Sequence, residues 1–282
     1  MLLLEEWNQQ RNVKRVSKYA KFEADRQFDF LSSLAYHLTI SYKTNKFTNS
    51  DLQTVYNKIF QDFDLLKNEM IIVINELESH NGLILQCGFE DFQFAHKSIQ
   101  EYLTADYIVK LPSIPNNRNI IQRLPNEIAI AIAISSKPSD YFNEFINEKL
   151  IPMKLNNQFI KPFINRLLLE KVDFNKNSYV AVSALNLYSA YLRSIDHQQL
   201  LLFYSDDLIV EFEKLIEGIF SRNDKQKFFS NYKISNTLSS SSGDEIYILG
   251  LKTEISIKLP PKLYCRESFV KDIELVFRTS LY

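Results

Sequence analysis

His96 is the residue of this sequence best placed to do chemistry. It ends a short alternating run that carries Phe92 and Phe94, and a helical pattern begins directly after it. A histidine at such a junction lies beside unpaired backbone N–H groups and the positive end of the helix dipole. These groups favour an anion, and an imidazole among them can donate a hydrogen bond to a phosphate. His96 is therefore a candidate anion-binding residue, and the alternative is that it only caps or packs at the junction.

The other polar groups are poorly spaced for a site. His37, His80 and His197 have no cysteine or carboxylate at metal-ligand spacing, so the sequence predicts no metal site. Glu76 and Glu78 are separated by a single residue, and their side chains would diverge on a helix. We therefore do not expect them to act as the paired carboxylates of an acid–base catalyst.

Glycine is scarce, which excludes two kinds of nucleotide-binding loop. The 282 residues include only Gly82, Gly88, Gly218, Gly243 and Gly250. A Walker phosphate loop needs the pattern G-x-x-x-x-G-K-[ST], and a dinucleotide loop needs G-x-G-x-x-G. Neither pattern occurs, and neither does a nucleophile elbow, an H-E-x-x-H or a C-x-x-C motif. We therefore expect no standard ATP or NAD loop and no enzymatic activity in this chain.

Charge and composition give no sign of a nucleic-acid or membrane protein. The 33 basic and 34 acidic residues leave a net charge of −1, so no overall field favours an anionic partner. No apolar run approaches the roughly 18 residues of a membrane span, and Glu5 follows the N-terminus too soon for a signal peptide. Cys87 and Cys265 lie far apart in sequence. These features predict a cytoplasmic protein with free thiols.

Apolar residues at helical spacing predict several helices in the N-terminal part of the chain. Two are expected between residues 2 and 41. Thr48 and Asp51 form a capping-box pattern that opens another helix, and a further helix is expected over about residues 68–79. Gly82 follows it and suits the left-handed conformation that ends a helix.

A change to alternating periodicity follows. The alternating residues are Leu83, Leu85 and Cys87, then Phe92, Phe94 and His96, on either side of a turn at residues 88–91. They predict a β-hairpin. The next helix is expected to open with a second capping box, Ser98 with Glu101, to keep Tyr102 on its apolar side and to end at Pro112. Helices followed by a short hairpin are typical of a winged-helix domain.

The rest of the chain is predicted to be mainly helical. The expected segments are roughly 126–136, 139–149, 157–171, 178–195 and 205–221. No clean internal period emerges, so an irregular helical bundle and a degenerate helix-pair array are both open. Alternating runs at residues 246–251 and 254–259 predict a second hairpin.

The predicted fold is therefore mostly α. A winged-helix domain with a short β-hairpin wing is followed by an irregular helical bundle or array and a small α+β C-terminal appendage. The expected parts are a helical segment at 1–40, the winged helix at 41–112, a helical domain at 113–222 and the α+β region at 223–282.

The segment at residues 92–105, FQFAHKSIQEYLTA, carries a family resemblance. It resembles the F-x-F-x-H-x-S-x-Q-E-Y-x-x-A signature at the end of the winged-helix domain in NACHT-type signal-transducing NTPases. This group includes animal NOD-like receptors and bacterial antiphage NACHT proteins. Further similar stretches are residues 3–11, which look like the helix that closes the NACHT module, and residues 30–35, 75–83 and 125–130. The resemblance covers about residues 1–150.

The resemblance implies a role for His96. In NOD-like receptors the histidine at this motif position contacts the β-phosphate of ADP and holds the winged helix on the nucleotide domain in the resting state. His96 would do the same if paired with a nucleotide domain. The chain itself is expected to hold no cofactor, whereas ADP or ATP belongs to the complete family architecture.

The family architecture also implies partners. Its ATPase core, with the Walker elements, precedes the winged helix, so the chain is expected to be the C-terminal part of such a protein, as a truncated reading frame, a split gene or an isolated fragment. The expected partner is a NACHT ATPase domain in cis or in trans, and like chains can form an oligomer. The function implied is a non-catalytic regulatory or sensor part of a signalling NTPase in cytoplasmic antiphage defence, a form of innate immunity.

Two other functions stay open. The helical region can be a partner-binding scaffold with no signalling role. A DNA-binding winged helix is disfavoured, because residues 51–64, taken as the recognition helix, hold one base, Lys58, against Asp51, Asp62 and Asp64. A nucleic-acid partner is therefore not expected.

Overall fold

The computed structural model describes residues 17–19, 22–42 and 44–174, helical positions 180, 183–184, 186–187, 190–191 and 215, and two strands at 246–248 and 255–257. The chain forms two compact units, Met1–Ile134 and Ser135–Tyr282. The predicted first helix and most of the predicted segments beyond residue 174 lie outside the described residues. The predicted domain boundaries stay a prediction.

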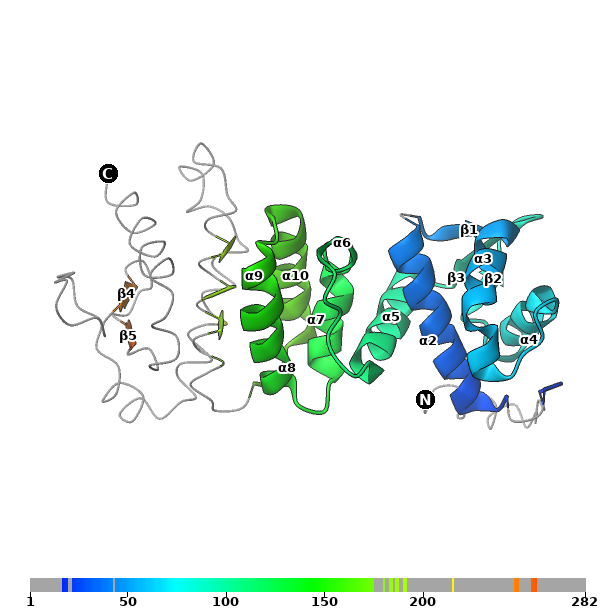
Figure 1. Ribbon diagram of the computed structural model, residues 1–282, viewed down its shortest axis with the longest axis horizontal. Helices are drawn as coiled ribbons and strands as arrows, with labels where there is room; N and C mark the ends of the chain where they lie inside the picture. Colours follow the sequence, from blue (N-terminus) through cyan, green and yellow to red (C-terminus); the bar gives the residue numbers. More distant parts are fainter. Residues whose placement is uncertain are drawn as a thin grey trace. The chain divides into compact units, whose positions relative to one another are not determined.

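The first unit alternates helices with short strands (Figure 1). Its elements are α2 (Ala24–Ser41), β1 (Lys46–Thr48), α3 (Asn49–Ile59), the 3-10 helix η1 (Phe60–Phe63), α4 (Met70–Asn81), β2 (Ile84–Gln86), β3 (Asp91–Phe94), α5 (Lys97–Lys110), α6 (Arg118–Ile121) and α7 (Pro125–Ile134). The short α6 was not anticipated from the sequence. Helix, strand, two helices and a hairpin in this order make a winged-helix topology, which is the fold class that the sequence predicts.

Both predicted signals at the ends of α3 and α4 are confirmed. Thr48 Oγ1 accepts the backbone N–H of Asp51 at 3.2 Å, and Asp51 Oδ2 accepts the backbone N–H of Thr48 at 2.9 Å. This reciprocal capping box starts α3. Gly82 ends α4 at φ 62°, in the left-handed region that costs glycine least.

A small antiparallel sheet in the order β1-β3-β2 contains the predicted hairpin. The inward side of β3 is as predicted, with Phe92 and Phe94 buried. In β2 the predicted phase is wrong by one residue, because Ile84 is buried and its neighbours Leu83 and Leu85 are only partly buried. Ile84 pairs directly with Phe94, so both side chains enter the same core. β1, which the sequence pattern did not show, pairs with the other edge of β3.

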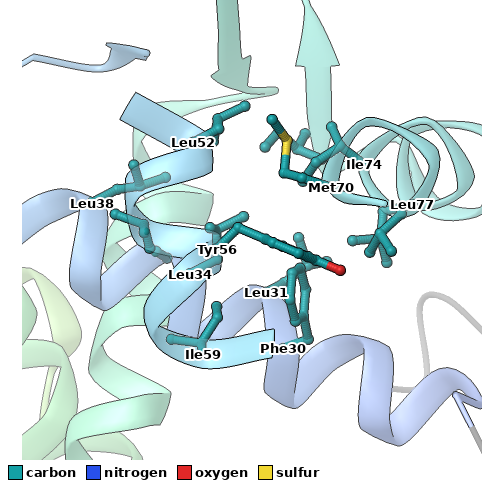
Figure 2. Packing of buried hydrophobic residues seen from close by; sticks show 14 of the residues in the cluster. Phe30, Leu31, Leu34, Leu38, Leu52, Tyr56, Ile59, Met70, Ile74 and Leu77 are labelled. Atoms are coloured by element: carbon teal, nitrogen blue, oxygen red, sulfur yellow. The ribbon is translucent and has the colours of Figure 1, made fainter. Parts of the chain in front are cut away.

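The core of this domain lies between α2, α3 and α4. Figure 2 shows their apolar side chains pointing toward one another, with Tyr56 of α3 in the middle. The rings of Phe30 and Tyr56 meet edge to face at 6.1 Å, an arrangement that aromatic pairs favour. The Tyr56 hydroxyl donates to the carbonyl of Leu66 at 2.8 Å, so its polar end is satisfied. The apolar residues that recur at helical spacing in α2 therefore form one side of the core.

The second unit is helical over its described N-terminal part. α8 (Pro138–Glu144), the π-helical segment η2 (Phe145–Leu150) and α9 (Ile151–Met153) follow one another without a break, and α10 (Asn157–Glu170) comes next. Phe145, Phe159 and Phe163 form a buried aromatic cluster between them. The predicted C-terminal hairpin is present as β4 (Ile246–Ile248) and β5 (Ile255–Ile257), which pair antiparallel.

Among the described residues, no helix is both long and apolar enough to cross a membrane.

Removing a buried leucine from α2 tests this core. Leu34→Ala deletes a fully buried side chain, so we expect it to lower the free energy of unfolding by about 2–5 kcal/mol. Urea denaturation followed by circular dichroism measures the loss. The control is Leu66→Ala, whose side chain is exposed and which we expect to change stability by less than about 0.5 kcal/mol. Equal losses for both variants would contradict this description of the core.

Candidate functional site

His96 is the residue from which α5 starts. It lies just past β3 in extended conformation, with φ −148° and ψ 149°, and is the N-cap of the 14-residue helix. Its Nδ1 accepts the backbone N–H of Ser98 at 3.2 Å and lies 2.7 Å from Ser98 Oγ. The imidazole thus satisfies one of the free N–H groups at the helix N-terminus and stays exposed.

This contact fixes which nitrogen of His96 carries the proton. A backbone N–H can only donate, so Nδ1 must offer its lone pair. In the neutral imidazole the proton therefore sits on Nε2, and the Ser98 hydroxyl donates to Nδ1. This assignment follows from the hydrogen-bond network. His96 presents an N–H donor beside the positive end of α5, the arrangement that suits a phosphate oxygen.

The predicted capping box of Ser98 with Glu101 is wrong. The chain leaves the sheet at Ala95, whose N–H donates to Leu83 O at 2.9 Å, and the helix begins within two residues of that bond. Ser98 is therefore already inside the first turn, and the cap is His96. Glu101 is buried and accepts from Asn126 Nδ2 of α7 at 2.9 Å, with Lys97 Nζ 3.5 Å away. It links α5 to α7 instead of capping α5.

Gln100 ties the same helix to α2. Its Nε2 donates to Thr39 Oγ1 at 2.9 Å, and Thr39 Oγ1 lies 3.3 Å from Thr104 Oγ1. Gln100 and Thr104 are both buried and Thr39 is partly buried, so these bonds satisfy polar groups that have little access to water. Two neighbouring residues of the 92–105 segment, Gln100 and Glu101, therefore bind α5 to two different helices.

The position of Tyr102 on α5 differs from the prediction. Its side chain is 45% exposed, whereas Leu103, Ala105 and Ile108 of the same helix are buried. Tyr107 stacks on Tyr36 of α2, with ring centroids 4.7 Å apart. Burial, with Tyr107 as a second cause, raises the pKa of Tyr36. The aromatic contact adds to the polar one in holding α5 against α2.

The two carboxylates of α4 serve different contacts. Glu76 Oε1 accepts from Ser17 Oγ at 2.5 Å and Glu76 Oε2 from the backbone N–H of Lys18 at 3.2 Å. Glu78 Oε1 accepts the backbone N–H of Gln86 in β2 at 3.1 Å. Glu76 thus fastens the segment that leads into the domain, and Glu78 fastens the hairpin. The structure does not bring them together at one site.

The remaining sequence candidates do not converge on His96. His80 Nδ1 lies 3.4 Å from Gln27 Nε2, and His37 lies beside Tyr36. Burial is the main cause that lowers the pKa of His37. His197 lies outside the described residues. Over the described part of the chain, no three His, Cys, Asp or Glu residues gather in a way that would hold a metal ion.

The helix in the recognition position is α4, because it directly precedes the hairpin. Residues 51–64, which the sequence suggested as the recognition helix, instead lie on α3, on η1 and at the residue that ends η1. α4 reads MIIVINELESHN and contains neither lysine nor arginine. The electrostatic argument against DNA binding therefore applies to α4 as well, and the expected lack of a nucleic-acid partner stays a prediction.

These elements define a winged-helix domain in which a histidine follows the last strand and caps the next helix. Residues 1–108 match a family model described as a winged helix-turn-helix domain C-terminal to NACHT. This part of the chain is thus a NACHT-associated winged-helix domain, as the sequence resemblance indicated. No curated protein and no solved structure matches the chain.

Two substitutions of His96 separate its capping role from its imidazole. His96→Ala removes the acceptor for the Ser98 N–H, so we expect a loss of about 1 kcal/mol in the free energy of unfolding. His96→Asn keeps an N-cap acceptor and should stay within about 0.5 kcal/mol of the wild type. Thermal unfolding of the whole chain measures both. Equal stability of all three proteins would show that the imidazole does not cap α5.

Proposed function

We propose that this chain supplies the nucleotide-state sensor of a NACHT-type signalling NTPase. In this proposal His96 binds the β-phosphate of ADP when a NACHT ATPase domain, in cis or in trans, provides the rest of the pocket. The chain contributes no catalytic group and holds no nucleotide alone. Its helical second unit senses a ligand or forms an assembly surface with like chains.

The observation that carries the proposal is the contact between His96 Nδ1 and the Ser98 backbone N–H, which assigns the proton of the neutral imidazole to Nε2. Nδ1 is engaged with Ser98, which leaves Nε2–H as a donor on an exposed side chain at the positive end of α5. Hydrogen bonds to a charged acceptor are stronger than neutral ones. A nucleotide domain that places ADP against the winged helix would therefore find a donor already oriented, at little cost in side-chain entropy.

The contacts of α5 support a signalling role for such a bond. A ligand on His96 acts on the N-cap of a helix that Gln100 joins to Thr39 of α2 and Glu101 joins to Asn126 of α7. Moving α5 would break buried polar contacts on two sides, so the helix resists independent motion. Loss of the phosphate would release the winged helix and α7 together.

Retention of ADP tests the sensor role. His96→Asn in a complex with a NACHT ATPase domain should bind ADP about ten- to a hundredfold more weakly, because a charge-assisted hydrogen bond is worth roughly 1.5–3 kcal/mol. The dissociation rate of a fluorescent ADP measures the change. Tyr102→Phe is the control, since it keeps an exposed aromatic ring on the same helix.

A His96→Asn complex that keeps ADP as tightly as the wild type would refute the sensor role. The chain would then be better described as a helical partner-binding scaffold. Affinity purification from a native extract distinguishes the two functions, because a NACHT ATPase partner supports the sensor and an unrelated partner supports the scaffold.

We further propose that the complete system acts in prokaryotic antiphage defence. The support is the likeness of residues 92–105 and 125–130 to bacterial NACHT proteins. In bacteria that carry the complete system, His96→Asn should change the efficiency of phage plating by about tenfold or more, because the resting state loses a bond worth that factor. Equal plating on strains with and without the system would exclude a defence role.

A further inference from the structure

We infer that the outer face of α4 and the tip of the wing form a docking surface for a protein segment that carries apolar side chains flanked by lysine or arginine. This surface is separate from the His96 end of the domain, and the inference does not rest on nucleotide sensing.

The outer face of α4 is partly apolar and carries no lysine or arginine. Met70, Val73, Ile74 and Leu77 turn into the core, and the opposite side of the helix carries Ile71, Ile72, Asn75 and Ser79. Ile71 is 40% exposed and Ile72 43% exposed. Two adjacent isoleucines on the presented helix of a winged-helix domain leave apolar area in water that a partner would cover.

The tip of the wing adds an aromatic side chain. Phe89 lies between the hairpin strands and is 91% exposed. Its loop is braced, because the Phe89 carbonyl accepts from Gln86 Nε2 at 3.0 Å and the Glu90 carbonyl accepts from the N–H of Asn49 at 2.9 Å. A ring held out on a fixed loop loses little entropy on binding, as interface anchors require.

Two hydrogen bonds connect the two parts of this surface. Glu78 lies two helical turns from Ile71 on the same side of α4, and it accepts the N–H of Gln86 at 3.1 Å. Gln86 in turn holds the Phe89 carbonyl. The exposed row of α4 therefore runs from Ile71 to the base of the wing, and one segment can contact both.

The charges around this surface determine which kind of partner it can bind. Carboxylates border the surface at Glu78 on the helix and at Glu90 and Asp91 on the wing, where the last two are exposed. α4 has no lysine or arginine, and Lys67 lies in the turn before it. These carboxylates would repel the phosphates of a nucleic acid. A segment with apolar side chains and flanking bases complements both the isoleucines and the acidic border.

The surface is remote from the proposed nucleotide contact. The wing tip precedes β3 and His96 follows it, so they lie at opposite ends of this strand. His96 and Phe89 therefore belong to different ends of the hairpin and need not contact the same partner. The two contacts can therefore be tested independently.

The test uses the full chain and two labelled probes, a short amphipathic helical peptide of leucine and lysine and a matched peptide of leucine and glutamate. We expect fluorescence anisotropy to show binding of the leucine–lysine peptide alone. Ile72→Lys and Phe89→Ser should each weaken it by about tenfold or more. The control Leu169→Lys makes the same change at a side chain that is 74% exposed on α10, and should stay within about twofold of the wild type.

Three results would overturn the inference. One is equal binding of both peptides, and another is unchanged binding by Ile72→Lys and Phe89→Ser. The third is a concentration-dependent dimer, seen by sedimentation, that Ile72→Lys abolishes, because it would assign the surface to a second copy of the chain. Phe89→Ser keeps the test valid if Ile72→Lys unfolds, since Phe89 is almost fully exposed. His96→Asn should bind the peptide normally, which separates this result from the nucleotide experiment.

Discussion

The domain depends on α2 being buried on two sides. One side carries Phe30, Leu31, Leu34 and Leu38 into the core with α3 and α4. The other side meets α5 through a stacked pair of tyrosine rings, the Thr39–Gln100 bond and a bond from Ser32 Oγ to Asp106 Oδ2 at 3.0 Å. A helix with both sides occupied cannot shift against one neighbour without disturbing the other. The position of α5, and with it that of His96, is therefore set by the same helix that organises the winged-helix core.

The side of α2 that faces α5 makes polar contacts, and these contacts matter for function. Apolar surfaces pack in many registers, whereas Thr39, Gln100 and Ser32 meet their partners in only one. The α2–α5 pair is thus held at a defined offset, which places the N-terminus of α5 at a fixed distance from the sheet. A phosphate contact needs this kind of accuracy, because a hydrogen bond weakens steeply with misplacement.

The sequence predicted those features that depend on neighbouring residues. The Thr48–Asp51 box, the Gly82 terminus and the hairpin each follow from chemistry within a few positions, and the structure confirms them. It did not predict β1, which has only three residues and exists through its pairing with β3. The inward position of Ile84 likewise depends on its partner strand. Such features are set by tertiary contacts, which a local pattern does not contain.

The candidate site divides in the same way. The sequence motif identified His96 as a candidate site residue. The position of its proton could be assigned only from the structure, because it depends on Nδ1 accepting a backbone N–H. The cap was expected at Ser98, because Ser-x-x-Glu is a strong local signal. The helix begins earlier than this signal indicates, because the sheet ends just before it. Glu101 therefore bonds to α7 instead of taking part in a cap. The role of Tyr102 was misjudged because the helical pattern does not tell which side of α5 faces its neighbours.

The bond between Glu76 and residues 17–18 has a mechanical consequence. Glu76 is buried, and pulling Ser17 and Lys18 away would strip it of two donors. A buried carboxylate left without donors is costly, by several kcal/mol. Residues 17–18 are therefore held against α4 by a contact whose loss would be costly, so a displacement of this segment would be transmitted to the helix.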